Sequence, residues 1–430
     1  MLYVKFIKEN YENLKESLIK RNQTEKVEWL EIIIERDKKW RLLKQKVDKL
    51  RHKRNELTDR IRELKIQKKK YDLILKQAQT IPEKIKLIEN EMQELEKQTN
   101  SYLERIPNVL HESVPAGKDE KDNIPFKFSK EKTNFKFKPK SHGELLEKAG
   151  LADFNAGRIN SGQGFNYLIG DAAELDLAIQ KFGIDFLLSK GFQLISPPLV
   201  LNRATLAGTV TLQDFEDVIY KFENEDLYII GTGEHPLVAL NKGKVFRKED
   251  LPIKICTLTP CFRKEIGSRG VDTKGLFRMH QFYKVEQVII SDQESSYKYF
   301  EEMEKITEEF FKKLEIPYRV IEICSGDLGP KFTKQYDIEA WFPRQGEYRE
   351  VTSCGNTEEY QSASLNITYK DGEEKKYCHL LNNTMVATSR AMVSIIENLQ
   401  NEKGEIKIPK ALRKYIYNKK KIGGLKNERR

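Results

Sequence analysis

The sequence predicts an α+β protein in which a mainly antiparallel sheet is flanked by helices and is preceded by an antiparallel helical hairpin. Three features support this fold class. The first hundred residues carry a helical seam of apolar side chains. The later chain contains strand-like runs that follow one another through turns, which favours antiparallel pairing. Neither GxGxxG nor GxxxxGK[ST] occurs, which disfavours a Rossmann or Walker-type nucleotide site.

The composition is that of a large chain with an excess of positive charge. Its 430 residues suffice for two or three domains, and the formal net charge of +10 favours an anionic partner. No long uncharged apolar window occurs and the N-terminus has no apolar signal core, so we expect no membrane span and a cytoplasmic location. The five cysteines show no CxxC spacing, which makes disulfides and a structural zinc site unexpected.

Residues 1–110 are predicted to form a helical domain with a long coiled-coil arm. One helix runs from about Val27 to Ile66, and a second follows Pro82, which either begins that helix or kinks a longer one. Residues 38–70 hold fifteen Lys and Arg against four Asp and Glu. A basic arm can lie along a phosphate backbone, although a solvated helix face is the common alternative.

Residues 111–141 form a turn-rich linker, and residues 142–430 a second domain with a basic C-terminal tail. Residues 174–190 have the apolar period of a helix. The strand predicted at Gln193–Val200 contains two prolines, which places it at an edge or a subunit contact. The other predicted strands are Leu227–Gly231, Ile255–Arg263, Arg278–Ile290, Tyr336–Trp341 and Ala363–Tyr369.

The segment Cys261–Glu286 holds two strand-like runs around a Gly-rich, charged loop. Because alternate residues of a strand share a face, Arg263 and Glu265 point the same way. The second run places on one face Arg278, Phe282, Lys284 and Glu286. Arginine for phosphate, an aromatic ring for a base and carboxylates for amine or hydroxyl groups together suit a nucleotide. The alternative is the wet side of an ordinary hairpin.

Two further segments carry side chains that suit a small polar substrate and its metal ion. Thr232 and Glu234 follow a predicted strand, where they can hold an ammonium group, although a simple turn is the better explanation from these residues alone. Glu350 and Ser353 supply hard oxygen ligands of the kind that bind magnesium together with substrate phosphates, although a polar strand end is the plainer explanation.

A third segment precedes and begins a helix. Asn382 and Thr384 lie just before it, and Arg390 falls on its first turns. An arginine at this position is normally solvated. If it points inward at a polyphosphate, it neutralises charge on the leaving group.

The order FRxE, loop, FRxHQFxKxE resembles motif 2 of the class II aminoacyl-tRNA synthetases, and most closely that of the seryl-tRNA synthetases. The helix with Gly191, Phe192 and Pro198 looks like motif 1, which usually forms the dimer interface, and Asn382–Gln400 looks like motif 3. The ATSR run in motif 3 looks more archaeal or eukaryotic than bacterial. GTGEHP, EVTSCGN and IPNVLHESVPAGKDEKDN are similar to other segments of the same family, so the resemblance covers nearly the whole chain.

The resemblance implies a homodimeric ligase that forms seryl-adenylate from serine, ATP and Mg²⁺ and transfers the seryl group to tRNA(Ser), with tRNA(Sec) left open as a second acceptor. It implies catalytic roles for Arg263 and Arg390. The implied ATP-binding residues are Arg263, Lys264, Glu265, Arg278, Phe282, Glu350, Val351, Thr352, Ser353 and Arg390. The implied serine-binding residues are Thr232, Gly233, Glu234, Arg263, Glu286, Asn382 and Thr384. Magnesium would bind Glu350 and Ser353. The implied tRNA contacts are Lys44, Arg51, Lys53, Arg54, Lys68, Lys69, Lys70, Ser268 and Arg269.

The chain departs from the family pattern at two places. Many members carry FQARR after the magnesium segment, whereas Tyr360–Ser364 reads YQSAS and lacks both arginines. Gly233 stands where the family often has Ser or Ala. Two alternatives remain open: a related ligase that acylates a carrier protein, which would lack such an arm, and a non-catalytic paralogue that binds RNA, which would have lost the phosphate-binding arginines.

Overall fold

The computed structural model describes residues 1–211, 218–265 and 275–424, which divide into two compact units. The predicted tRNA contacts Ser268 and Arg269 lie outside the described residues. One unit spans Leu2–Pro107, and the other holds Met1 and Asn108–Arg430. The predicted linker, residues 111–141, therefore belongs to the second unit.

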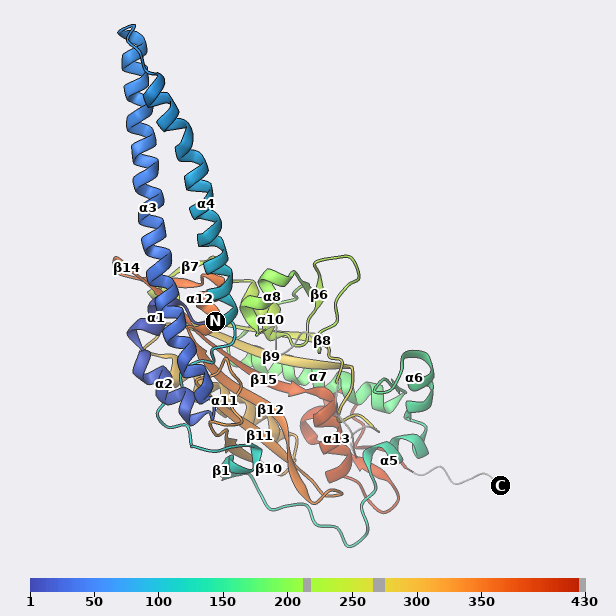
Figure 1. Ribbon diagram of the computed structural model, residues 1–430. Coiled ribbons are helices and arrows are strands. Elements are labelled where there is room, and N and C mark those ends of the chain that lie inside the picture. The colour runs from blue at the N-terminus through green and yellow to red at the C-terminus, as the bar shows by residue number, and fades with distance from the viewer. Residues whose placement is uncertain (212–217, 266–274, 425–430) are drawn as a thin grey trace. The chain divides into compact units, whose positions relative to one another are not determined.

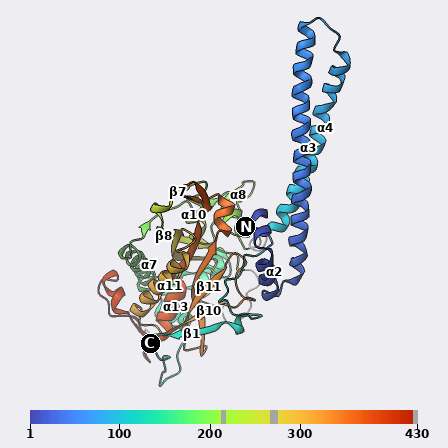
Figure 2. The same cartoon turned by 90° about the vertical axis from the view of Figure 1, so that its left-hand side faces the viewer.

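The unit Leu2–Pro107 is helical, as the seam predicts. Its helices are α1 (Val4–Glu9), α2 (Tyr11–Lys20), α3 (Val27–Ile66) and α4 (Asp72–Leu103). The two long helices α3 and α4 run antiparallel along each other (Figures 1 and 2). Val47 of α3 packs with Ile81 and Ile85 of α4 in the seam. Pro82 lies inside α4, so this helix begins before the proline and not at it.

The second unit is built on an eight-stranded sheet in the order β1-β10-β11-β12-β15-β9-β8-β4. All neighbouring strands are antiparallel except β4 and β8, which confirms the predicted sheet. The strands are β1 (Ile124–Phe128), β4 (Gln193–Leu194), β8 (Ile253–Phe262), β9 (Gln281–Ser291), β10 (Tyr318–Glu322), β11 (Lys334–Phe342), β12 (Glu347–Glu358) and β15 (His379–Ala387).

Three helices cover one face of this sheet: α7 (Asp171–Ser189), α11 (Ser296–Lys313) and α13 (Thr388–Asn398). Strand β9 shows how the period of two divides its residues between the two faces. Val285 and Ile289 join the core with these helices, whereas Val288 and Ile290 join a second cluster with Leu237. Leu237 belongs to α10 (Glu234–Ala239), so α10 packs on the opposite face.

Smaller elements surround the sheet. The remaining α-helices of the described residues are α5 (His142–Ala149), α6 (Phe154–Ser161), α8 (Arg203–Thr209) and α12 (Tyr360–Leu365). The remaining strands are β2 (Ala152–Asp153), β3 (Tyr167–Leu168), β5 (Val200–Leu201), β6 (Tyr228–Ile229), β7 (Val245–Arg247), β13 (Thr368–Asp371), β14 (Glu374–Tyr377), β16 (Glu405–Lys407) and β17 (Lys421–Gly423).

Two sequence predictions of local structure are wrong. The strand predicted at Ala363–Tyr369 is divided between α12 and β13, because Asn366 adopts a left-handed conformation (φ 52°) that ends the helix. The strand predicted at Gln193–Val200 is interrupted, and β4 retains its place at the sheet edge. Within the basic C-terminal segment, β17 pairs with β16.

Candidate active site

A cavity of about 290 Å³ opens on the sheet face that carries α10. Segments far apart in the sequence line it, including the ends of β8 and β9, the middle of β12 and β15, and the beginning of α13. The predicted site residues that line the cavity are Thr232, Glu234, Arg263, Glu265, Arg278, Phe282, Glu350, Val351, Thr352, Ser353, Asn382, Thr384 and Arg390. Gly233 and Glu286 lie directly behind this lining. Lys264, predicted to bind ATP, is not part of this lining, and its amine lies 5.8 Å from the centroid of the Tyr220 ring.

One side of the cavity holds three guanidinium groups from three segments of the chain. Arg263 directly follows β8 and Arg278 precedes β9, so neither lies on a strand as the sequence predicted. Arg263 donates from Nε to the carbonyl oxygen of Gly231 at 3.1 Å, and its Cζ lies 5.7 Å from the centroid of Phe282. Arg278 Nη1 lies 3.9 Å from Glu265 Oε2. Arg390 comes from the first turn of α13. The aromatic face and the converging positive charges suit a base and a polyphosphate.

Arg349 adds a further guanidinium beside this group, and the sequence did not predict it as a site residue. Arg349 Cζ lies 3.8 Å from the centroid of Phe277, and Arg390 Cζ lies 5.3 Å from the same ring. Phe277 lines the cavity. The sequence feature that could have identified Arg349 was its position immediately before the predicted magnesium ligand Glu350. Two arginines held against one ring restrict each other's positions.

A β-bulge aligns the two predicted magnesium ligands. In the pairing of β11 with β12, Ser353 lies opposite Asp337 and Glu350 opposite Glu339, while Val351 has no opposite residue. Residues three apart on a regular strand face opposite sides, and the extra residue returns Glu350 and Ser353 to one side. Both therefore line the cavity with oxygen atoms, which fits magnesium held by two protein ligands and substrate phosphates.

The Glu350 carboxylate is already paired with a site arginine. Its Oε1 lies 3.0 Å from Arg390 Nη1, which also donates to the Glu350 carbonyl oxygen at 3.2 Å. This guanidinium holds the pKa of Glu350 below its ordinary value. Burial, with Glu350 nearby, raises the pKa of Asp337 well above its ordinary value. Of these two carboxylates, Glu350 is the one whose charged form the surroundings favour.

The other side of the cavity is organised around the buried Glu286 carboxylate. Its Oε1 accepts hydrogen bonds from Thr232 Oγ1 at 2.7 Å and Thr384 Oγ1 at 3.3 Å, and Lys284 forms an ion pair with it. Glu286 Oε2 and Asn382 Oδ1 are buried without a hydrogen-bond partner among the described residues. Such acceptors suit the donor groups of a small polar substrate.

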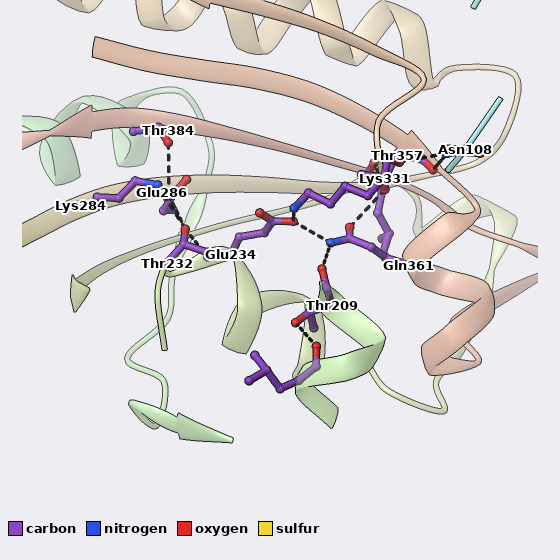
Figure 3. Close-up of polar contacts among 12 residues, drawn as sticks. Asn108, Thr209, Thr232, Glu234, Lys284, Glu286, Lys331, Thr357, Gln361 and Thr384 are labelled. Atoms are coloured by element: carbon purple, nitrogen blue, oxygen red, sulfur yellow. Dashed lines mark hydrogen bonds and ion pairs between the residues drawn. The ribbon is translucent and has the colours of Figure 1, made fainter. Parts of the chain in front are cut away.

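Glu234 is held by two residues that the sequence did not single out (Figure 3). Its Oε1 accepts a hydrogen bond from Gln361 Nε2 at 2.7 Å and forms an ion pair with Lys331. Lys331 itself lines the cavity. Gln361 is the glutamine kept from the family's FQARR pattern, and this was the signal available for it. Burial and the charges of Lys331, Arg263 and Lys284 lower the pKa of neighbouring His235 well below its ordinary value.

Close packing explains why glycine stands at position 233. A Cβ atom added there would lie 2.7 Å from Thr257 Cγ2, 3.0 Å from Thr259 Oγ1 and 3.2 Å from Glu286 Cγ. The first distance is too short for any real contact, and Thr257 is fully buried. The glycine therefore lets the turn before α10 approach β8 and the Glu286 carboxylate.

This sheet and cavity define a class II aminoacyl-tRNA synthetase core. The family model for the tRNA synthetase class II core domain (G, H, P, S and T) matches residues 220–399. The model for the seryl-tRNA synthetase N-terminal domain matches residues 1–110. One model thus matches the helical unit, and the other matches the central part of the unit Asn108–Arg430.

Whole-chain comparisons identify the particular family. The serine–tRNA ligase of Pyrococcus horikoshii is 44% identical over 100% of this chain and 99% of its own length. That of Methanospirillum hungatei is 44% identical over 97% of this chain and 99% of its own length. The crystal structure of the Pyrococcus horikoshii seryl-tRNA synthetase complexed with ATP matches with a TM-score of 0.91 and 43% identity, covering 99% and 100% of the two chains. The cytoplasmic enzyme of Naegleria fowleri in complex with AMP matches at 0.83 and 33%, covering 97% and 96%. The chain therefore belongs to the seryl-tRNA synthetase family.

Proposed function

We propose that the cavity performs both steps of serine–tRNA ligation, first forming seryl-adenylate from serine and ATP and then passing the seryl group to tRNA. One observation carries this proposal: Arg263, Arg278 and Arg390 converge with Phe282 on a cavity whose other wall is the polar cluster around Glu286. A nucleotide triphosphate and a small amino acid would therefore be placed side by side.

The first step is an in-line attack of the serine carboxylate on the α-phosphorus, with pyrophosphate as the leaving group. Phe282 would stack on the adenine, Glu265 would bind along its edge, and Arg263 would hold the α-phosphate and the serine carboxylate. Arg278 and Arg390, with Arg349 beside them, would neutralise the β- and γ-phosphates. The residues mainly position reactants and stabilise charge, and such positioning can contribute on the order of 7–11 kcal/mol.

Serine would bind on the opposite wall. Glu234 would hold its ammonium group, together with Thr232 and Glu286. Its hydroxyl would donate a hydrogen bond to one of the two unpaired acceptors, Glu286 Oε2 or Asn382 Oδ1. A site built to bind a hydroxyl group strongly rejects analogues that lack it, because its buried polar groups are then left without partners. Alanine should therefore be excluded.

Glu350 and Ser353 would hold magnesium on the phosphate side. When bound, the ion would neutralise negative charge on the substrate phosphates. Because Glu350 is paired with Arg390, the carboxylate would exchange part of this contact for the ion, and the guanidinium would turn to phosphate.

The basic arm would bind tRNA through its phosphates. The predicted contacts on α3 and the turn after it are all exposed: Lys44, Arg51, Lys53, Arg54, Lys68, Lys69 and Lys70. Exposed basic residues gain affinity by releasing counterions, so this binding should weaken steeply with salt. Recognition would be by RNA shape, through phosphate and sugar contacts.

The motif 1 region suits a homodimer. Large apolar side chains are exposed on α7, on edge strand β4 and just after it, namely Leu177, Leu188, Leu194 and Leu199. Exposed apolar residues gathered near a free sheet edge are typical of subunit contacts. Analytical ultracentrifugation would measure the mass in solution. A monomer at micromolar concentration would contradict this part of the proposal.

A cytoplasmic location accords with five cysteines that are free and buried. Among the described residues, no helix is long and apolar enough to cross a membrane.

Pyrophosphate exchange is the direct test of the proposed function. The purified protein should exchange labelled pyrophosphate into ATP with serine and without tRNA, and far more slowly with threonine, glycine or alanine. Deleting residues 30–105 should abolish charging of tRNA(Ser) and leave exchange intact. Exchange with another amino acid in preference to serine would refute the substrate, and charging by the deletion variant would refute the role of the arm.

A further inference from the structure

We propose that Lys331 is an internal competitor for the ammonium group of serine. Its amine is paired with the Glu234 carboxylate, and serine must take over that carboxylate in order to bind. The inference rests on the proposed role of Glu234 in holding serine. It assigns a role in setting serine affinity to a residue outside the class II motifs.

The backbone at Lys331 is fixed independently of its side chain. The backbone N–H of Asn108 donates to Pro330 O at 2.7 Å, and Asn108 Nδ2 donates to Lys331 O at 3.1 Å and to Thr357 O at 2.8 Å (Figure 3). Asn108 is buried. The main chain therefore holds the lysine at the cavity wall whichever partner its amine has.

Phe332, the next residue, packs closely against strand β12. A Cβ atom at Gly355 would lie 2.2 Å from Phe332 Cε1, so only glycine at this position of β12 leaves room for the ring. The Lys331 amine lies 4.8 Å from the centroid of that ring. The amine thus lies between a carboxylate and an aromatic ring, and both contacts favour its position beside Glu234.

Gln361 keeps Glu234 in place while its partner changes. Gln361 Nε2 donates to Thr209 O and to Glu234 Oε1, each at 2.7 Å. Both of these atoms are acceptors, so the amide cannot be turned around, and Thr357 Oγ1 lies 3.1 Å from Gln361 Oε1 on the other side. The carboxylate therefore stays oriented when Lys331 leaves it.

Burial determines the direction in which loss of Lys331 should change the affinity for serine. Both side chains are largely buried, with 13% of Lys331 and 4% of Glu234 exposed, so an unpaired charge at either group is unfavourable. Serine restores one ammonium–carboxylate pair but must displace another. Removing the lysine charge should leave Glu234 oriented and unneutralised, and serine should then bind more tightly. A ligand without an ammonium group gains nothing from this change.

The test compares Lys331 with Lys334, which begins strand β11 three residues later, in the full-length protein. Lys331→Met should lower the KM for serine in pyrophosphate exchange about five- to tenfold, with little change in kcat. Lys331→Arg, which keeps the charge, should stay near the wild-type value. Lys334→Met is the matched control, because Lys334 is equally buried, pairs with Glu322 at 3.3 Å and does not line the cavity. Its KM should be unchanged.

Two further measurements keep the outcome decisive. The inhibition constant of glycerate, which has a hydroxyl in place of the ammonium group, should be the same for wild type and Lys331→Met. The melting temperature of Lys331→Met without serine should be lower than that of wild type, and serine should raise it more. An unchanged or higher KM for Lys331→Met, or equally improved glycerate binding, would overturn the inference.

The variant Glu234→Gln separates this inference from the proposed function. If Glu234→Gln binds serine as well as wild type does, the proposed role of Glu234 is wrong and the inference fails with it. If Glu234→Gln loses serine while Lys331→Met leaves the KM unaltered, only the competition is wrong.

Discussion

The packing around Gly233 allows one substitution to be worked out from distances. In Gly233→Ala the new methyl group would meet Thr257 Cγ2 at 2.7 Å, Thr259 Oγ1 at 3.0 Å and Glu286 Cγ at 3.2 Å. The backbone conformation at Gly233 (φ −66°, ψ −17°) is open to any residue, so the cost arises from packing alone. Neither β8 nor Glu286 can move without disturbing the Thr232 hydrogen bond.

The expected magnitude is modest. Overpacking a filled core by one methyl group costs about 1–3 kcal/mol. Replacing glycine by alanine at an allowed conformation returns about 0.4–1 kcal/mol through the unfolded chain. The variant should therefore be less stable by roughly 0.5–2 kcal/mol. The KM for serine should also rise, because the strain falls on the residues that hold Glu286.

A double-mutant cycle provides the assay. Thr257→Ser removes the methyl group that the new Cβ would meet and keeps the hydroxyl. In urea unfolding and in pyrophosphate exchange, Gly233→Ala/Thr257→Ser should recover most of what Gly233→Ala loses, and Thr257→Ser alone provides the control. If Gly233→Ala is as stable as wild type, or if the two changes are additive, the packing explanation is wrong.

Three more outcomes follow from the cavity and its surroundings. Arg390→Met should slow adenylation about 10²–10³-fold, as the loss of a charge-stabilising group does. The rate of pre-steady-state pyrophosphate release measures this effect, and a wild-type rate would show that Arg390 has no role in catalysis. Gln361→Leu should raise the KM for serine more than it lowers kcat, because it frees Glu234 to turn; a change in kcat alone would contradict a positioning role. Burial lowers the pKa of His379 to about 4, so the unfolded chain takes up its proton first as pH falls, and stability should decrease from about pH 6.5 down to about pH 4, by roughly 3 kcal/mol. The pH dependence of urea unfolding should be flatter in His379→Gln, and an unaltered slope would refute the assignment.

Local pattern was sufficient wherever a simple period governs the structure. The heptad-like spacing predicted the hairpin of α3 and α4. The period of two correctly grouped Phe282, Lys284 and Glu286 on one side of β9, but Arg278, predicted on the same face, lies before that strand begins. The position of Arg390 at the first turn of α13 also followed from the apolar period of that helix.

Features that depend on pairing with another strand could not be predicted from the sequence. The bulge at Val351 is defined by register with β11, so the sequence could not show that Glu350 and Ser353 share a side. The helix α12 is stabilised from outside, since Ser362 donates to Cys378 O and Leu365 packs in the second core cluster. Gln361 and Lys331 were likewise not predicted as site residues, because their common partner, Glu234, is distant in sequence.

Most charged groups of the cavity are already paired with one another. Glu265 is paired with Arg278, Glu350 with Arg390, Glu286 with Lys284, and Glu234 with Lys331. Substrate binding at such a site exchanges ion pairs instead of creating them, so affinity depends on how much better phosphate or ammonium fits than the resident partner. Removing one member of a pair therefore changes two quantities, the contact with the substrate and the stability of the empty cavity. Kinetic effects of single charge removals at these positions have to be interpreted together with the stability of the substrate-free protein.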